Sequence, residues 1–138
     1  MNWPSAAAES HYKTALLIQR ELKIGHIEDA AAGMQELIDA LSRSEKRELR
    51  SQLIRLMVHV LKWHMQPDGR SRSWSATIIN SREEIADIQE ETPSLSDDVI
   101  RGLWDKCFRA AVRQVEGETN LTCPITQLTW QEVFVELR

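Results

Sequence analysis

Apolar residues recur at intervals of three and four along most of the chain, which is the spacing of one face of an α-helix. The spacing predicts helices over residues 4–23, 27–42 and 44–66, a fourth between residues 70 and 92, a fifth over 94–115 and a short one from residue 129. No segment of comparable length alternates as a β-strand does. We therefore expect an all-α protein, a single-domain bundle over residues 1–138 of five main helices plus a short C-terminal helix.

The third predicted helix is apolar over more than half of its circumference. Ser42 and Glu45 are spaced as a capping box, which marks a helix start. Placed 100° apart, its apolar residues form a broad arc and leave one narrow polar stripe. A helix of this kind needs neighbours on several sides, so we expect residues 44–66 to be the central helix. The arc comprises Leu49, Leu53, Ile54, Leu56, Met57, Val58, Val60, Leu61, Trp63 and His64, and the stripe Glu48, Gln52, Arg55, His59, Lys62 and Gln66.

Composition and charge add to this expectation. The 138 residues are 42% hydrophobic and 28% charged, which is typical of a globular domain. The net charge of −4 divides into −3 over residues 1–42, +6 over 43–82 and −7 over 83–138. A basic block between acidic ones can bind an anionic partner, but it more often pairs with the acidic helices of its own bundle. No apolar run is long enough to span a membrane, no signal peptide is evident, and Cys107 and Cys123 form no disulfide framework, so we expect a cytoplasmic protein.

The richest chemistry lies between residues 59 and 82. Pro67, Asp68 and Gly69 predict a tight turn, so that Trp63 and Trp74 approach each other and frame the intervening arginines. Such a corner could bind an anion, although indoles at helical spacing are usually core residues and arginines beside them often stack or cap helix ends. We favour the structural interpretation. The binding candidates are Lys62, Trp63, Arg70, Arg72, Trp74 and Arg82.

Catalytic and metal-binding candidates are weak. His59 could form a general acid–base pair with Glu36 or Asp39 of the second predicted helix. A histidine on a polar stripe more often makes a structural hydrogen bond. His59 and His64 are five residues apart, unlike ligand pairs at i,i+4, and no nucleotide-binding or hydrolase motif is present. We predict neither a metal nor a cofactor.

One run of residues is distinctive. The segment from His59 to Ile78, followed by Arg82 and Ile85, resembles the signature of a bacterial family catalogued as domain of unknown function number twenty-nine. The resemblance extends upstream to residues 43–47 and downstream to 93–95 and 118–119. It differs at Glu36-Leu37-Ile38-Asp39, where the family tends to have Glu-Glu-Ile-Glu, and near Leu128. The resemblance implies an all-helical fold and no known activity.

Three classes of function remain open. We favour a non-enzymatic helical interaction protein that binds a protein partner or a second copy of itself. The second class is anion or nucleic-acid binding through the basic segment 43–82, which the pI near 5.6 disfavours. The third is an enzyme that uses His59 with a carboxylate of the second helix. We expect no membrane partner.

Overall fold

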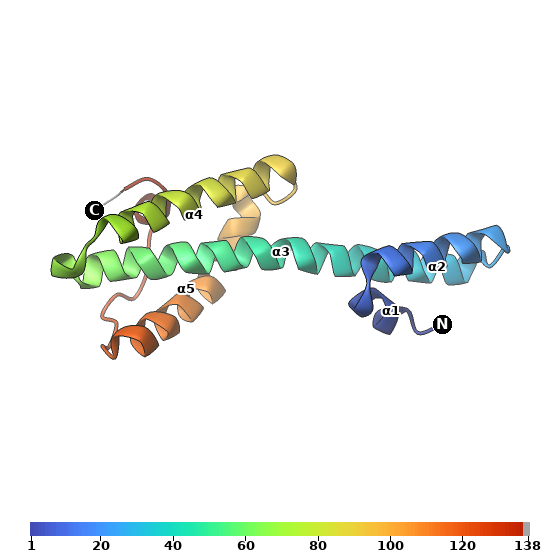
Figure 1. Cartoon of the computed structure of the whole chain (residues 1–138), viewed down its shortest axis with the longest axis horizontal. Coiled ribbons are helices and arrows are strands. Elements are labelled where there is room, and N and C mark those ends of the chain that lie inside the picture. The colour runs from blue at the N-terminus through green and yellow to red at the C-terminus, as the bar shows by residue number, and fades with distance from the viewer. Residues whose placement is uncertain (137–138) are drawn as a thin grey trace. The chain divides into compact units, whose positions relative to one another are not determined.

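The structure is a computed structural model that describes residues 1–136, and within this range it is helical and contains no β-strand. The all-α prediction is confirmed, and so is a central helix that contains most of residues 44–66 (Figure 1). The elements are α1 (Trp3–Glu9), α2 (His11–Lys23), α3 (Ile27–Met65), a 3-10 turn η1 (Pro67–Gly69), α4 (Arg72–Glu91), α5 (Asp97–Thr119) and α6 (Trp130–Phe134). None of these helices is long and apolar enough to cross a membrane.

The chain forms two compact units, Met1–Arg47 and Glu48–Arg138, which we call the first and second unit. The first contains α1, α2 and the beginning of α3, and the second contains the rest of α3 with α4, α5 and α6. Each unit has its own cluster of buried apolar residues. That residues 1–138 act as a single domain stays a prediction.

The first helix predicted over residues 4–23 is divided in two at Ser10. This residue has extended backbone angles, φ −160° and ψ 122°, and its hydroxyl accepts a hydrogen bond from Lys13 N at 3.1 Å. Serine is a preferred N-cap because its side chain satisfies a donor that a helix start leaves free. Ser10 therefore ends α1 and begins α2, and the prediction of one uninterrupted helix is wrong.

A second difference concerns residues 42–45, where the predicted break does not occur. The chain is helical through Ser42 and Glu45, and the second and third predicted helices form one helix, α3. Between Gly33 and Pro67 the sequence contains neither glycine nor proline, so nothing forces the backbone to leave the helix. Ser42 and Glu45 match a capping box only in spacing.

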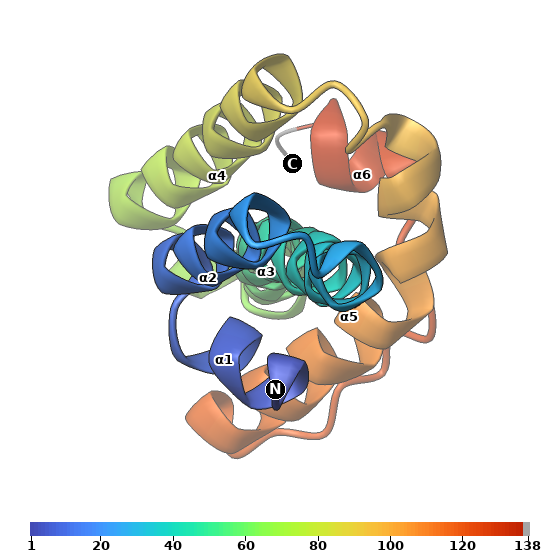
Figure 2. The same cartoon turned by 90° about the vertical axis from the view of Figure 1, so that its right-hand side faces the viewer.

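The interior of the first unit combines one indole with two large aliphatic side chains, Ile18 and Leu37, and several small residues. Trp3 is 4% exposed, and a Cβ added to Gly33 would lie 2.8 Å from its ring and 2.9 Å from Ile18. The indole N–H of Trp3 donates to Asp29 Oδ1 at 2.9 Å. Figure 2 shows α1 against one side of the α2–α3 pair. The other buried residues of these helices include Ala7, Thr14, Glu21, Ala30, Leu37 and Ala40.

The second unit is packed around the apolar arc of α3, as the sequence predicts. Leu49, Leu53, Leu56, Met57 and Leu61 are completely buried. Residues from α4, α5 and the C-terminal segment pack in the same cluster, so the arc is covered from several sides. These partners are Ile78, Ile85, Ile88, Leu95, Ile100, Cys107, Ala111, Val115, Leu128 and Val133.

The ends of the last two helices are well defined. Helix α5 extends to Thr119, one turn beyond the predicted end at Val115, and Asn120 terminates it with a left-handed φ of 58°. The predicted cap of α6 is confirmed, because Thr129 and Glu132 form a reciprocal capping box. The helical spacing from Trp130 onward also predicts that Leu137 faces inward, and this residue lies outside the described residues.

Replacing Gly33 with alanine tests the close packing of the first unit. The added methyl group would overlap Trp3 and Ile18, so we expect the Gly33→Ala variant to lose about 1–3 kcal/mol of unfolding free energy in urea denaturation. Gly102→Ala is the matched control, because Gly102 is also within a helix and has nothing near its added Cβ. That variant should gain about 0.5–1 kcal/mol. An equal gain of unfolding free energy in both variants would contradict the close contact of Gly33 with Trp3 and Ile18.

Candidate functional site

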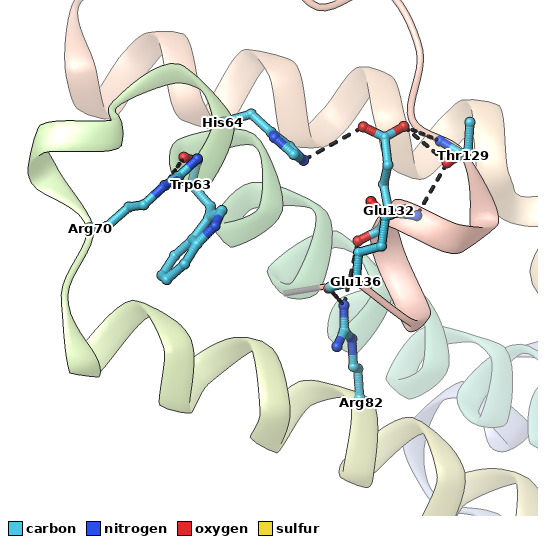
Figure 3. Close-up of polar contacts among 7 residues, drawn as sticks. All are labelled: Trp63, His64, Arg70, Arg82, Thr129, Glu132 and Glu136. Atoms are coloured by element: carbon cyan, nitrogen blue, oxygen red, sulfur yellow. Dashed lines mark hydrogen bonds and ion pairs between the residues drawn. The ribbon is translucent and has the colours of Figure 1, made fainter. Parts of the chain in front are cut away.

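The predicted corner between Trp63 and Trp74 exists and is the junction of α3 and α4 (Figure 3). The chain leaves α3 at Met65, passes through the 3-10 turn and starts α4 at Arg72, where Ser71 Oγ accepts from Trp74 N at 3.2 Å. The Trp74 ring covers Gly69, where an added Cβ would lie 3.2 Å from the ring. The ring pairs recorded within residues 1–136 lie elsewhere, among Trp104, Trp130 and Phe134, so the expected pairing of Trp63 with Trp74 is not seen.

Arg70 closes the C-terminal end of α3. Its Nε donates to Trp63 O at 2.7 Å, and its guanidinium carbon lies 4.9 Å from the centre of the Trp63 ring. A cation at a helix C-terminus stabilises the free carbonyl groups there. The Trp63 N–H is shielded from water and has no hydrogen-bond partner in the described part of the chain, an arrangement that costs about 1–3 kcal/mol. Arg70 therefore stabilises the corner.

Arg82 connects α4 with the end of α6 (Figure 3). Its Nε donates to Val133 O at 2.8 Å, and one terminal nitrogen donates to the carbonyl groups of Glu132 and Glu136. The carbonyl groups of Glu132 and Val133 belong to the last turn of α6, where a helix has no N–H donors of its own for its carbonyl oxygens, and Glu136 follows that helix. Partial burial lowers the pKa of Arg82 from its ordinary value. The Nε and one terminal nitrogen of this guanidinium are therefore occupied by backbone oxygens.

Lys62 is paired with a carboxylate of α5. Its Nζ lies 2.5 Å from Glu118 Oε2, and Gln114 Nε2 donates to Glu118 Oε1 at 3.1 Å. The hydrogen bond from Lys62, followed by that from Gln114, lowers the pKa of Glu118 below its ordinary value. The positive charge of Lys62 on α3 thus pairs with the negative charge of Glu118 on α5, within the same unit.

His64 lies beside the cap of α6. Its Nε2 is 3.5 Å from Glu132 Oε2, while Glu132 Oε1 accepts from the backbone N–H and the hydroxyl of Thr129, both at 3.0 Å (Figure 3). The carboxylate that closes the capping box therefore also faces an imidazole. This arrangement fixes α6 against α3.

The proposed acid–base pair of His59 with Glu36 or Asp39 is not brought together. His59 Nδ1 is 2.9 Å from Arg55 O of its own helix, and burial lowers its pKa. Asp39 accepts a hydrogen bond from Gln35 at 3.0 Å. All of these residues are on α3, where only residues three or four positions apart face each other. Among residues 1–136, no hydrogen bond or ion pair joins His59 to either carboxylate.

The thiol of Cys107 is buried in the core of the second unit. Burial raises the pKa of Cys107 to about 11, and its Sγ–H faces Arg50 O at 3.9 Å. Such a thiol stays protonated at neutral pH and is a poor nucleophile. No group of three or more histidine, cysteine, aspartate or glutamate side chains within residues 1–136 could hold a metal ion.

Of the four predicted basic residues, only Arg72 has neither a hydrogen bond nor an ion pair within residues 1–136, and it is exposed at the first residue of α4. The other three have partners inside the second unit: Lys62 pairs with a carboxylate, and Arg70 and Arg82 donate to carbonyl groups at helix ends. The segment from His59 to Arg82 is thus a packed structural corner. Its basic groups do not converge on one open site.

A different surface of the molecule is unusual. Most of the large apolar side chains that the structure leaves exposed belong to α2 and the start of α3, in the first unit. They follow the two rows of helical spacing that mark these helices in the sequence, while residues between the rows, among them Ile18, Ala30 and Leu37, form the interior. We call this set the apolar face: Tyr12, Leu16, Leu22, Ile24, Ile27, Met34, Ile38 and Leu41, each 42–74% exposed.

Opposite charges accompany the two helices of the apolar face. Helix α2 carries exposed Lys13, Arg20 and Lys23, and its one carboxylate, Glu21, is buried and lies 2.6 Å from His26 Nδ1. Residues 27–42 of α3 contain four acidic residues and neither lysine nor arginine. Glu28 and Asp39 are exposed and directly follow Ile27 and Ile38. One helix of the face is therefore basic and the other acidic.

Reasoning from the sequence missed this surface as a candidate site. The rows were evident in the hydrophobic spacing, but their exposure was not, because a helix with one apolar row is typical of both a core helix and an interface helix. The available signal was the charge contrast between residues 11–23 and 27–42. A concentration of tryptophan and arginine drew the prediction to residues 59–82 instead.

The geometry gives a helical protein with large apolar side chains exposed on α2 and at the start of α3. A family model described as Domain of unknown function DUF29 matches residues 15–134. The chain belongs to this family, as the resemblance of residues 59–85 predicts. No curated protein and no solved structure matches the chain.

The ion pair of Glu118 with Lys62 should make stability depend on acidity. Because the pKa of Glu118 is lowered by folding, its contribution is present above its ordinary value of 4.5 and is lost as the pH falls through the folded value. We expect Glu118→Gln to lower the unfolding free energy at pH 7 by under about 1 kcal/mol, since the carboxylate is 44% exposed. The difference from wild type should shrink as the pH falls below 4.5 in urea denaturation. Glu83→Gln, at an exposed position of α4, should show no such dependence.

Proposed function

We propose that this protein is a non-enzymatic interaction protein and that its partner is a second copy of the same chain, bound through the apolar face of the first unit. The observation that carries the proposal is the exposed row on α3. Ile27, Met34 and Leu41 are seven residues apart, and Ile38 falls between the last two at helical spacing. Repeats of seven are typical of helices that pack against other helices.

The exposure of this row is a cost to an isolated chain. Burying apolar surface is worth about 25 cal/mol per Å², and a contiguous exposed patch is common at sites of protein association. Ile27 is 59% exposed and Ile38 51%, although small residues beside them are buried. A partner that covers the row recovers this free energy.

The charges favour a second copy over an unrelated partner. In a two-fold dimer each surface meets its own equivalent, so the surface must be complementary to itself. The apolar face meets this condition when basic α2 of one copy lies along acidic α3 of the other. Two such helical hairpins form a four-helix arrangement with apolar side chains inside and opposite charges at its edges.

The other two functions receive less support. Nucleic-acid binding would use cations along the whole segment 43–82, but three of them, Lys62, Arg70 and Arg82, have intramolecular partners. Catalysis by His59 would need a neighbouring carboxylate, and its recorded hydrogen-bond partner is a backbone carbonyl. As part of the same proposal we place the protein in the cytoplasm of a bacterium, because Cys107 and Cys123 are both free thiols and the family resemblance is to bacterial proteins.

Sedimentation equilibrium of the full chain tests the proposal. We expect a dimer of about 32 kDa, twice the chain mass of 15.9 kDa. Ile38→Asp should give a folded monomer, because it places a charge in the middle of the apolar face without touching the buried residues. Ile79→Asp, at an exposed isoleucine of α4 in the second unit, is the matched control and should remain dimeric.

Charge reversal tests the identity of the partner. Lys13→Glu with Lys23→Glu, and separately Glu28→Lys with Asp39→Lys, should each weaken the homodimer, and a mixture of the two variants should form a heterodimer. Circular dichroism checks that each variant keeps its helices. A wild-type chain that stays monomeric at 100 μM would overturn the proposal. So would a dimer that Ile38→Asp leaves intact, or a variant mixture that does not associate.

A further inference from the structure

A cavity of about 400 Å³ lies within the first unit, where the end of α1 and the start of α2 meet α3. This volume is within the range of roughly 300–1,000 Å³ that is usual for small-molecule sites. The binding candidates predicted at the corner, Lys62 to Arg82, do not line this cavity, but the basic segment 43–82 predicted for anion binding includes its residues Arg43 and Arg47. The lining residues are Ala7, Ala8, Glu9, Ser10, His11, Ala40, Arg43, Ser44 and Arg47.

Two arginines from the same face of α3 line the cavity. Arg43 and Arg47 are four residues apart, so their side chains are neighbours on the helix, and like charges at this spacing are destabilising. Neither guanidinium has a hydrogen bond or an ion pair to any residue between 1 and 136, and both residues are exposed. Lys62, Arg70 and Arg82 differ from them, because each has an intramolecular partner. The unpaired forks are suited to a ligand with several acceptor oxygens.

The start of α2 adds donors to the same cavity. Ser10 Oγ accepts from Lys13 N, so its O–H remains available to donate. The backbone N–H groups of His11 and Tyr12, in the first turn of α2, have no acceptor in the described part of the chain. The dipole of α2, a helix of 13 residues, makes this end partially positive. The guanidinium groups and the helix end therefore favour the same sign of ligand charge.

Glu9 is the one carboxylate that lines the cavity, and it restricts the kind of anion. It repels a small, fully charged ion, but it can accept hydrogen bonds from ligand hydroxyl groups. The volume also exceeds that of an inorganic ion. A ligand with a dianionic end toward the arginines and a polyol end toward Glu9 satisfies both conditions.

We propose that this cavity binds a phosphate monoester of a small polyol, with Arg43 and Arg47 holding the phosphate group at the start of α2. The site is independent of the apolar face. Arg43 and Arg47 follow Ile38 by five and nine residues, which at 100° per residue places them about 140° and 180° around α3 from it. Ligand and partner copy can therefore be bound at the same time.

Calorimetric titration of the full chain with glycerol 3-phosphate tests the site, with glycerol as the uncharged control. We expect saturable binding of the ester and none of glycerol. The double variant Arg43→Gln with Arg47→Gln should weaken binding at least tenfold. Arg109→Gln with Arg113→Gln is the matched control, since it removes two exposed arginines of the same spacing from α5, and it should bind as wild type does.

Two further measurements locate the ligand and identify its source. In NMR spectra of the wild-type chain, the ester should shift the amide signals of residues 7–11 and 40–47, which needs no variant to fold. Vesicles of phosphatidylcholine with and without phosphatidic acid show whether a lipid carries the phosphate monoester. Glu9→Gln should weaken binding of the ester, because a hydrogen-bond acceptor for its hydroxyl groups is lost, and should strengthen binding of inorganic phosphate. If the variant bound both ligands more tightly, the polyol part of the proposed ligand would be contradicted.

Absence of ester binding, or equal binding by the Arg43/Arg47 double variant, would overturn the proposal. Binding of a DNA duplex through these arginines without binding of the ester would also overturn it. The Ile38→Asp variant separates this result from the proposed function, because it should remain monomeric and still bind the ester with the wild-type affinity.

Discussion

The second unit depends on one constraint, which is the need to bury the apolar arc of α3 between Leu49 and Leu61 on several sides. A sheet or a single partner helix could cover only part of this arc, and α4, α5 and the C-terminal segment together cover all of it. Once these elements surround α3, the free carbonyl groups at the ends of α3 and α6 and the carboxylate of Glu118 lie within reach of basic side chains. Arg70, Lys62 and Arg82 neutralise them, so the polar contacts of the corner follow from the burial of the arc.

Much of this unit could be predicted from the sequence, because its signals are local and strong. The apolar arc, the turn at Pro67–Gly69 and the capping box of α6 each involve residues close together in the chain. The partners of the basic residues could not be predicted in this way. Arg82 reaches carbonyl groups about fifty residues later, and no pattern within α4 indicates that distance. A cation that caps a distant helix and one that binds a ligand have the same appearance in a sequence.

The first unit was harder to predict because its interior uses small residues. Ala30, Gly33 and Ala40 allow α1 and α2 to approach α3 closely, and Trp3 fills the space between them. Hydrophobic spacing emphasises large residues such as Ile27 and Met34, which the structure leaves exposed. The helix boundaries in this region could not be told apart from sequence, because Ser10 and the pair of Ser42 and Glu45 both match the pattern of a helix N-cap. Only at Ser10 does one helix end and another begin.

The contacts of Arg82 have a consequence for synthesis of the protein. Its acceptors, two in α6 and one just beyond it, are 50 to 54 residues further along the chain. At a translation rate of about 5–20 residues per second, α4 waits roughly 3–10 s before those acceptors have been made. During this interval the arc of α3 has no cover from α6 in the nascent chain. The second unit can close only after Glu136 has been made, so α4 is synthesised well before the contacts that hold it against α6 can form.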